Sequence, residues 1–468
     1  MKMAPAPLGV WFIALVSCGA YAFLGWWLTA VPPSISSDDA RHFAAGLTRF
    51  SILDFSPHFP GYPAFIALGR LVREVVPDSV AALTLTSTIM AMLMPPAAAL
   101  VAWRWTCSPL AAVFGFALGL TQPLLPYLAL SGLSGSTGIL FLLMFFALLP
   151  AEVNATQRRF GKGVWLFAAG ISLGLSACAR PSLGPILLAS FGPLLFHRLR
   201  AAVVVGSGVL VVALPALLVI FALEGSNYIH EGVRFLEGHL YGWGNTAFSD
   251  RSGTSWVGSL NTFPALYVLL AVPSMVAVWR AFSPPLPLRE QALGAAFLAG
   301  LVWTAFFQNP ENLRHLAPIL SLGGIVIAIS AGRSGVGAGA AVVVLVIGGA
   351  IGVTNANVEA RQIAPLSQAA RVIDKAPGEP IVFTRRGVFY LREALSRARV
   401  YDLAFPATAM AALSPEPRLL FRLSRTPIKG CQPYRILLGR TFGEPSLHLY
   451  RTELSGADPE CLAALRTT

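Results

Sequence analysis

Residues 8–31 read LGVWFIALVSCGAYAFLGWWLTAV and contain no charged residue. A helix needs about 20 apolar residues to cross a bilayer, so this stretch predicts a membrane span. It is too long for the apolar part of a signal peptide, and no small-residue cleavage motif follows it, so we expect the helix to be retained. Similar runs recur until about residue 354. The sequence therefore predicts a polytopic integral membrane protein.

The composition agrees with this prediction. Of the 468 residues, 55% are hydrophobic and 12% are charged, whereas about 25% are charged in a soluble domain. The formal net charge of +12 is explained by the excess of Lys and Arg that marks cytoplasmic loops. Aromatic residues are not interleaved with a basic stripe, so no nucleic-acid partner is expected. The expected partner is membrane lipid.

Breaks between the apolar runs predict about eleven spans. With a cytoplasmic N-terminus, most cations of the short loops fall inside and most acids fall outside, and an odd number of spans leaves the C-terminal end outside. We expect the membrane to be the plasma (inner) membrane of a bacterium. The predicted spans are residues 9–31, 80–103, 109–130, 134–150, 163–179, 182–196, 201–222, 259–280, 289–308, 313–332 and 336–354.

Two predicted outer loops are long, residues 32–79 and 223–258. The first contains a helix start, because Ser36 or Ser37 precedes two aspartates, and residues 40–50 then read as a short amphipathic helix. A turn at residues 58–63 and an apolar segment at 64–76 follow. That segment is too short to cross the membrane, so we expect it to be re-entrant or interfacial.

The composition becomes that of a soluble protein from about residue 358. Strands are predicted at residues 380–384, 398–403, 435–439 and 446–450, with a helix at 387–397. Cys431 and Cys461 could form a disulfide if this region is extracytoplasmic. The expected fold is thus mainly α: a transmembrane helix bundle at residues 1–357 and a small extracytoplasmic α/β domain at residues 358–468.

The adjacent acids Asp38 and Asp39 are the best candidates for chemistry, because keeping ionisable groups at the membrane face costs free energy. A helix N-terminus would keep either acid ionised, as a general base requires. Neighbouring residues of a helix point about 100° apart, so one could act on a substrate while the other holds the loop. The alternative is an acidic first turn that only stabilises the helix.

Four further candidates flank apolar segments. His58 and Tyr62 offer hydrogen-bond donors within a turn. The alternative is that this turn is only a rigid connector. Arg180 and Arg314, the latter followed by His315, could bind a lipid phosphate through paired hydrogen bonds, or could be interface arginines that reach for water.

Several kinds of site are not supported by the sequence. It contains no phosphate-binding glycine loop, no His-Glu-x-x-His and no Cys-x-x-Cys pair, so neither nucleotide hydrolysis nor a set of metal ligands is predicted.

Four motifs together resemble the GT-C superfamily of membrane glycosyltransferases, in particular its protein O-mannosyltransferases and bacterial aminoarabinose transferases. The resemblance covers about residues 8–331. A stretch after Gly238-His239, Tyr241-Gly-Trp-Gly244, is also similar to bacterial members. The four motifs are Ser-Ser-Asp38-Asp39-Ala-Arg-His, His58-Phe-Pro-Gly-Tyr-Pro63, Gly-Leu-Ser-Ala-Cys-Ala-Arg180-Pro181 and Leu313-Arg314-His315-Leu-Ala-Pro318.

The resemblance implies a polyprenyl-phosphate sugar as donor and inverting transfer to a hydroxyl of an envelope glycan, lipid or protein. It assigns the base to Asp38 or Asp39 and the donor phosphate to Arg180 and Arg314, with His58 as a third candidate for the phosphate. Tyr62, His239 and His315 are further substrate-binding candidates. No cofactor is certain. A divalent cation stays open, because this chain has Ser134-Gly-Ser136 where many relatives have an acid.

Two other classes of function remain open from the sequence. A transporter or flippase of lipid-linked sugars also lines its path with acids and arginines, although the charges here cluster in outer loops and no two-half repeat is visible. A scaffold whose outer domain binds a partner would not need these charges. A polysaccharide polymerase or ligase is an alternative within the enzyme class.

Overall fold

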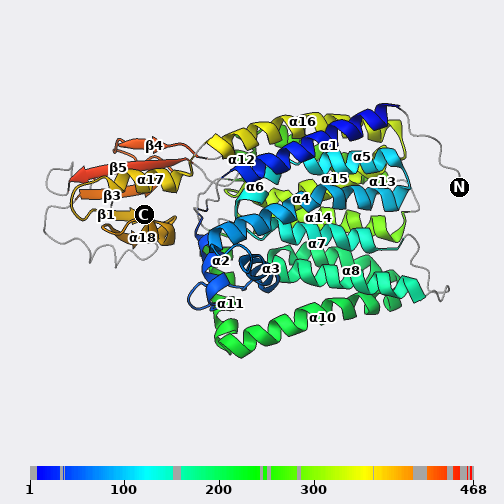
Figure 1. Ribbon diagram of the computed structural model, residues 1–468, viewed down its shortest axis with the longest axis horizontal. Coiled ribbons are helices and arrows are strands. Elements are labelled where there is room, and N and C mark those ends of the chain that lie inside the picture. Colours follow the sequence, from blue (N-terminus) through cyan, green and yellow to red (C-terminus); the bar gives the residue numbers. More distant parts are fainter. Residues whose placement is uncertain are drawn as a thin grey trace. The chain divides into compact units, whose positions relative to one another are not determined.

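The computed structural model describes residues 8–31, 35, 37–150, 160–242, 246–249, 255–281, 286–361, 363–403, 419–439, 446–453, 461 and 464–465. The chain divides into two compact units, residues 1–34 with 43–354 and residues 35–42 with 355–468. The first is a bundle of helices that lie side by side, and the second contains the sheet (Figure 1).

The first unit is built almost entirely of helices. Two elements are divided between the units: α2 (Asp38–Thr48) contributes residues 38–42 to the second unit and the rest to the first, and the helix at residues 335–361 passes into the second unit after residue 354. The other elements are α1 (Leu8–Ala30), α3 (Pro63–Arg73), α4 (Ser79–Thr106), α5 (Pro109–Leu120), α6 (Leu125–Leu130), α7 (Gly135–Leu148), α8 (Phe160–Ala179), η1 (Pro181–Leu183), α9 (Gly184–His197), α10 (Leu199–Glu224), α11 (Asn227–Glu237), the π-helix η2 (Gly238–Gly242), α12 (Trp256–Asn261), α13 (Ala265–Ala281), α14 (Leu288–Phe307), η3 (Leu313–Leu316), α15 (Ala317–Ala331) and α16 (Gly335–Arg361).

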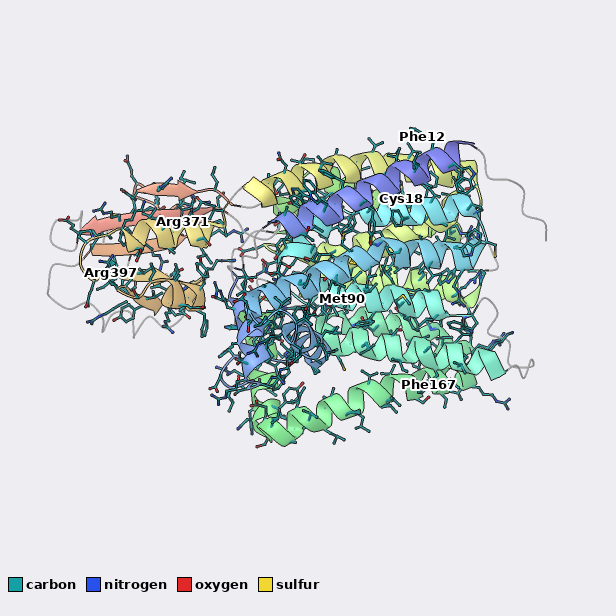
Figure 2. All side chains as sticks on the ribbon, in the orientation of Figure 1. Phe12, Cys18, Met90, Phe167, Arg371 and Arg397 are labelled. Carbon is teal, nitrogen blue, oxygen red and sulfur yellow. A yellow bond between two sulfur atoms is a disulfide. The ribbon has the colours of Figure 1, made fainter. Side chains whose placement is uncertain are left out.

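Within the described residues, seven helices are long and apolar enough to cross a membrane, and the other four predicted segments contain shorter apolar helices. Large apolar side chains on α1, such as Trp11 and Phe12, are exposed, as expected for a surface that faces lipid. Phe12 is labelled on this helix in Figure 2. The predicted span 109–130 is not continuous. α5 ends at Leu120 and α6 begins at Leu125, because Pro123 lacks a backbone N–H and disfavours the helical conformation of the residue before it.

The helices pack through small residues and hydroxyl groups. Lipid tails are as apolar as the helices themselves, so close backbone approach and hydrogen bonds must hold membrane helices together. The Ser87 hydroxyl of α4 donates to the Leu133 carbonyl, and the Ser136 hydroxyl of α7 donates to the Ser87 carbonyl, both at 3.1 Å. Gly170 of α8 and Gly208 of α10 lie against each other's helix backbone.

The short helix and the short apolar segment predicted in the first outer loop are present as the helices α2 and α3. The end of α2 is fixed by two arginines of α3, since Arg70 donates to the Gly46 carbonyl and Arg73 to the Leu47 carbonyl, each at 2.9 Å. Cations are favoured at this end of a helix, where carbonyl groups lack helical partners.

The second unit contains a five-stranded sheet of order β2-β1-β3-β5-β4, in which β1 pairs in parallel with β2 and β3, while β5 is antiparallel to β3 and β4. The predicted Cys431–Cys461 disulfide is present. The elements of the second unit are α17 (Pro365–Asp374), β1 (Ile381–Thr384), α18 (Val388–Ala394), β2 (Arg399–Asp402), β3 (Leu419–Ser424), β4 (Arg435–Leu437) and β5 (Leu447–Glu453).

The central strand, β3, was not predicted from the sequence. Its burial is nearly continuous, and the side chain of Arg422 in its middle is only 4% exposed. A charged residue at that position breaks the apolar pattern by which a buried strand is recognised.

The close approach of α8 and α10 leads to a stability prediction. Gly208→Val should lower the free energy of unfolding by about 1–3 kcal/mol, because a Cβ at this position meets the Phe167 carbonyl and the Gly170 Cα. The control is Gly206→Val on the same helix, where a Cβ meets nothing within 4 Å. Thermal unfolding of both purified variants in detergent tests this, and equal melting temperatures would contradict the packing argument.

Candidate functional site

The acidic pair begins α2. Ser37 caps the helix, because its hydroxyl oxygen accepts a hydrogen bond from the Ala40 N–H at 3.2 Å, and Asp38 and Asp39 occupy the first turn. Since neighbouring residues of a helix point in different directions, the two carboxylates meet different surroundings.

Asp38 caps a second helix. Its two carboxylate oxygens accept hydrogen bonds from the N–H groups of Gly387 at 3.0 Å and Tyr390 at 3.4 Å, at the start of α18. Burial raises the pKa of the Asp38 carboxyl from 3.8 to about 6; the bond from Tyr390 opposes this rise and the charge of Asp39 adds to it. These contacts give Asp38 a structural task within the second unit.

Two further residues of the same turn hold α18. Arg41 forms an ion pair with Glu393 at 2.9 Å, and its guanidinium lies over the ring of Tyr390, 5.1 Å from the centroid. The ring of His42 meets Phe389 edge-on, with centroids 4.7 Å apart. The start of α2 is therefore anchored to α18 by charge, by aromatic contact and by the cap from Asp38.

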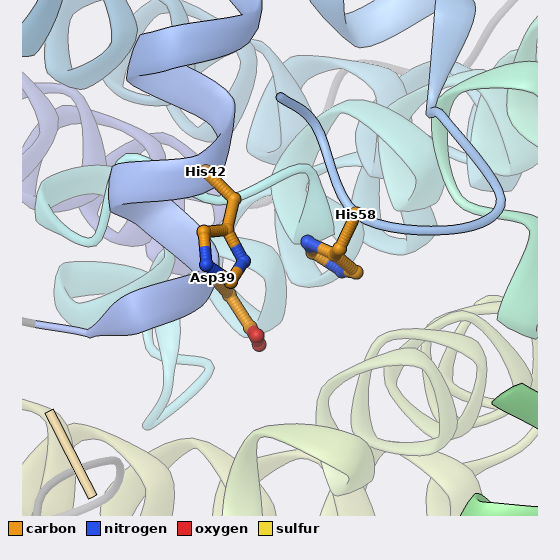
Figure 3. A group of neighbouring side chains, drawn as sticks. All are labelled: Asp39, His42 and His58. Carbon is orange, nitrogen blue, oxygen red and sulfur yellow. The ribbon is translucent and has the colours of Figure 1, made fainter. Parts of the chain in front are cut away.

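Asp39 and His42 lie three residues apart on α2, where side chains are neighbours. Figure 3 shows both on the helix, and their possible ligand atoms lie within 4.8 Å of each other. A carboxylate and an imidazole are ligands for several divalent cations. This pair could provide two ligands, fewer than a stable site needs.

The predicted turn at residues 58–63 is packed among aromatic rings. His58, drawn in Figure 3, is 7% exposed, and its ring centroid lies 5.1 Å from that of Phe43 and 5.0 Å from that of Tyr62. Gly61 (φ 95°) and Tyr62 (φ 48°) both have left-handed backbone conformations. That conformation is unfavourable for tyrosine, so the packing of the turn must hold it.

Helix α11 extends this group. Phe235 stacks on His58 and on His239, in each case with ring centroids 6.4 Å apart, and Gly232 lies against the ring of Phe59. His239 in turn lies 2.9 Å from the Phe307 carbonyl at the end of α14.

The structure therefore brings three of the predicted residues, His58, Tyr62 and His239, into one aromatic cluster. Phe235, which joins them, was not predicted. The richness of both outer loops in aromatic residues was the signal for it. The cluster consists of Phe43, His58, Phe59, Tyr62, Tyr228, Phe235 and His239.

Arg180 lies at the end of α8, against the start of α7, and is 7% exposed. A Cβ added to Gly135 would be 2.5 Å from the guanidinium nitrogen Nη1 of Arg180, and one added to Gly138 would be 2.7 Å from its Cβ. The hydroxyl of Ser176 donates to the Gly138 carbonyl at 2.7 Å and ties the two helices together. A buried guanidinium thus lies beside the positive end of α7, an arrangement that favours an anion.

Arg314 and His315 form part of η3, the 3₁₀ turn that leads into α15. The hydroxyl of Thr304 on α14 is 3.5 Å from the His315 carbonyl, so this turn lies at the same end of α14 as the contact between His239 and Phe307. The predicted residues of the first unit therefore fall on three junctions: the aromatic cluster, the α7–α8 contact and the α14–α15 connection.

No protein-family model matches the sequence, and no curated protein is similar to it in sequence. The fold is similar to that of ArnT from Cupriavidus metallidurans bound to undecaprenyl phosphate, with a TM-score of 0.52 and 14% identity over 97% of this chain and 100% of that one. Two structures of the Archaeoglobus fulgidus oligosaccharyltransferase are also similar. One contains an inhibitory peptide and a dolichol-phosphate (TM-score 0.51, 11% identity, 84% of this chain and 65% of that one). The other contains a tethered acceptor peptide (TM-score 0.51, 12% identity, 83% and 64%).

At these identities the likeness concerns the fold. The predicted resemblance is therefore confirmed as a likeness of fold, which the chain shares with ArnT and the oligosaccharyltransferase. The chain is an integral membrane protein with this fold.

The raised pKa of Asp38 predicts a pH dependence. An acid whose folded-state pKa exceeds its unfolded value stabilises the fold most below the unfolded pKa, and that stability is lost as the pH rises through the folded pKa. Protection of the α18 amides from hydrogen exchange, corrected for the intrinsic exchange rate, should therefore fall between about pH 4 and about pH 6. Asp38→Asn should remove this change, and Asp39→Asn should retain it. An unchanged profile in Asp38→Asn would show that another group titrates.

Proposed function

We propose that the protein transfers a sugar from a polyprenyl-phosphate donor to a hydroxyl of an envelope glycan, lipid or protein, with inversion at the transferred carbon. The observation that carries this proposal is the fold, which matches a structure bound to undecaprenyl phosphate over nearly the whole of both chains. The buried cation at a helix N-terminus in the first unit supports it independently.

The donor phosphate is assigned to Arg180. A guanidinium presents paired N–H groups that match phosphate oxygens, and the amide groups at the start of α7 add partial positive charge. Both features favour the phosphate most when it leaves, because negative charge then builds on its oxygen. Arg314 and His58 are assigned supporting roles toward the same phosphate, and the aromatic cluster is assigned to substrate contact.

The general base is assigned to Asp39. The raised pKa of Asp38 would suit a base near neutral pH, but both of its oxygens accept hydrogen bonds from the backbone of α18. Geometry takes precedence over pKa in choosing a base. Asp38 is therefore assigned to positioning the turn from which Asp39 projects.

The chemical step is a single displacement. The acceptor oxygen attacks the anomeric carbon, its proton passes to the carboxylate of Asp39, and the bond between that carbon and the phosphate oxygen breaks. One displacement inverts the configuration at the carbon. The products are the glycosylated acceptor and polyprenyl phosphate, and no nucleotide is consumed, in agreement with the lack of a phosphate-binding glycine loop in the sequence.

The reaction is assigned to the outer face of a bacterial plasma membrane, with the N-terminus in the cytoplasm. The Cys431–Cys461 disulfide supports an extracytoplasmic C-terminal unit, because disulfides persist in oxidising compartments and are rare in the cytosol.

Loss of the base is the first test. Asp39→Asn should lower the transfer rate by about 100-fold or more, while Asp38→Asn should retain most of it at matched protein levels. Mass spectrometry of envelope glycans from cells that express each variant should show a sugar-sized mass that only Asp39→Asn fails to add. The reverse order of the two variants would move the base to Asp38.

The same protein in detergent separates a transferase from a transporter. With no membrane between two compartments, a transferase still releases polyprenyl phosphate from its lipid-linked sugar when an envelope extract supplies the acceptor. A transporter releases none. Absence of release, together with identical glycan profiles for all variants, would overturn the enzyme assignment.

The position of Arg180 can be tested without removing its charge. Gly138→Ala should lower the transfer rate at least several-fold, because the new Cβ displaces Arg180. The rate should fall even though alanine is more favourable than glycine in a helix by about 1 kcal/mol. Gly184→Ala is the matched control, since a Cβ at this position meets nothing within 4 Å. Equal rates for both variants, measured as release of polyprenyl phosphate, would argue against a role for Arg180 in donor binding.

A further inference from the structure

A groove lies between α13, α14 and α15, at the end of α14 remote from His239. Its volume is about 320 Å³. Apolar side chains line most of it, including Val278, Leu298 and Ile329. Glu290, which lines the groove, and Phe307 lie 17 residues apart on α14, about 25 Å along its axis, so this end of the groove lies near the membrane face opposite the contact between His239 and Phe307.

Charged groups gather at one end of this groove. Glu290, 7% exposed, lies between two arginines, with Arg333 donating to both of its carboxylate oxygens at 2.6 and 2.9 Å. Arg280, which lines the groove with Glu290, donates one bond to the same carboxylate at 2.6 Å. One carboxylate thus faces two guanidiniums, and the paired N–H groups of Arg333 already bond to both of its oxygens.

Arg280 therefore contributes a surplus positive charge. Its side chain is 21% exposed, and of its five N–H donors one bonds to Glu290 within the described part of the chain. A cation that close to the mouth of an apolar groove fits a ligand with a negative head and an apolar body. Lys and Arg at a membrane face attract anionic lipids in this way.

We infer that this groove binds an anionic phospholipid of the adjacent leaflet, with its phosphate on Arg280 and an acyl chain along α14. Glu290 holds Arg280 in place, and Gln291 is fixed by its bond to the Leu286 carbonyl at 2.9 Å. The bound lipid would fasten α13 to α14 and α15 at this face of the membrane, whatever reaction the opposite face performs.

Two variants test separately the binding of the lipid's phosphate and the binding of its acyl chain. Arg280→Gln removes the surplus charge and leaves the pair between Arg333 and Glu290. Gly294→Leu fills the groove, because Gly294 lines it and a Cβ there meets nothing within 4 Å. Gly339→Leu on α16 is the matched control, since its Cβ also meets open space and it does not line the groove.

The test is native mass spectrometry of the full-length protein in mixed micelles, titrated with phosphatidylglycerol, phosphatidylcholine or inorganic phosphate. The wild type and Gly339→Leu should retain phosphatidylglycerol in preference to phosphatidylcholine. Arg280→Gln should weaken that binding about fivefold, the effect of about 1 kcal/mol for one interfacial cation. Gly294→Leu should weaken it at least as much, with thermal unfolding confirming that each variant is folded.

Three results would overturn the inference: equal retention of the two lipids by the wild type, unchanged retention of phosphatidylglycerol in Gly294→Leu, or full displacement of the lipid by an equal concentration of inorganic phosphate. The last would mean that the groove adds nothing to a simple anion site.

Discussion

Water is absent from the hydrocarbon core of a bilayer, so each backbone N–H and carbonyl group there must find its partner within the protein. This constraint accounts for the helical first unit and for its irregular parts. Where the chain departs from a regular helix, as between α5 and α6, it does so against other helices. The hydroxyl groups of Ser87, Ser136 and Ser176 then bond to carbonyl groups of neighbouring helices. The same constraint places glycines where α8 meets α10.

Buried charges have two different kinds of surroundings in this bundle. Glu290 is enclosed by two arginines, so a carboxylate and a guanidinium cancel and a second guanidinium remains. Arg180 is set against the start of α7, where the helix dipole also carries positive sign. The first arrangement leaves one positive charge in excess of the carboxylate; in the second, the charge of Arg180 and the helix dipole have the same sign. That difference is why we assign donor phosphate binding to Arg180 and lipid binding to the surplus charge of Arg280.

The acidic pair shows how one helical turn can divide two tasks. Both carboxylate oxygens of Asp38 accept hydrogen bonds from the N-terminus of α18, and Arg41 and His42 contact the same helix. Asp39, turned by about 100°, lies beside His42 on another side of α2. An essential Asp38 would therefore not by itself identify a catalytic base, because loss of the cap would also disturb the turn that carries Asp39.

The sequence by itself determined whatever depends on neighbouring residues: the apolar segments, the cap at the start of α2, the short helix and the short apolar segment of the first outer loop and most strands of the second unit. The order of four motifs was enough to predict the fold that the chain shares with ArnT and the oligosaccharyltransferase. Tertiary structure alone decided the rest. Asp38 accepts a hydrogen bond from Gly387, 349 positions away in the sequence. Phe235 lies between His58 and His239 and stacks on both. Arg422 is buried in β3, and its charge is the reason that this strand was not predicted. Helix periodicity and caps are local and can be read from a few residues. The task of a charged side chain depends on which distant groups share its buried surroundings, and only the folded chain brings those groups together.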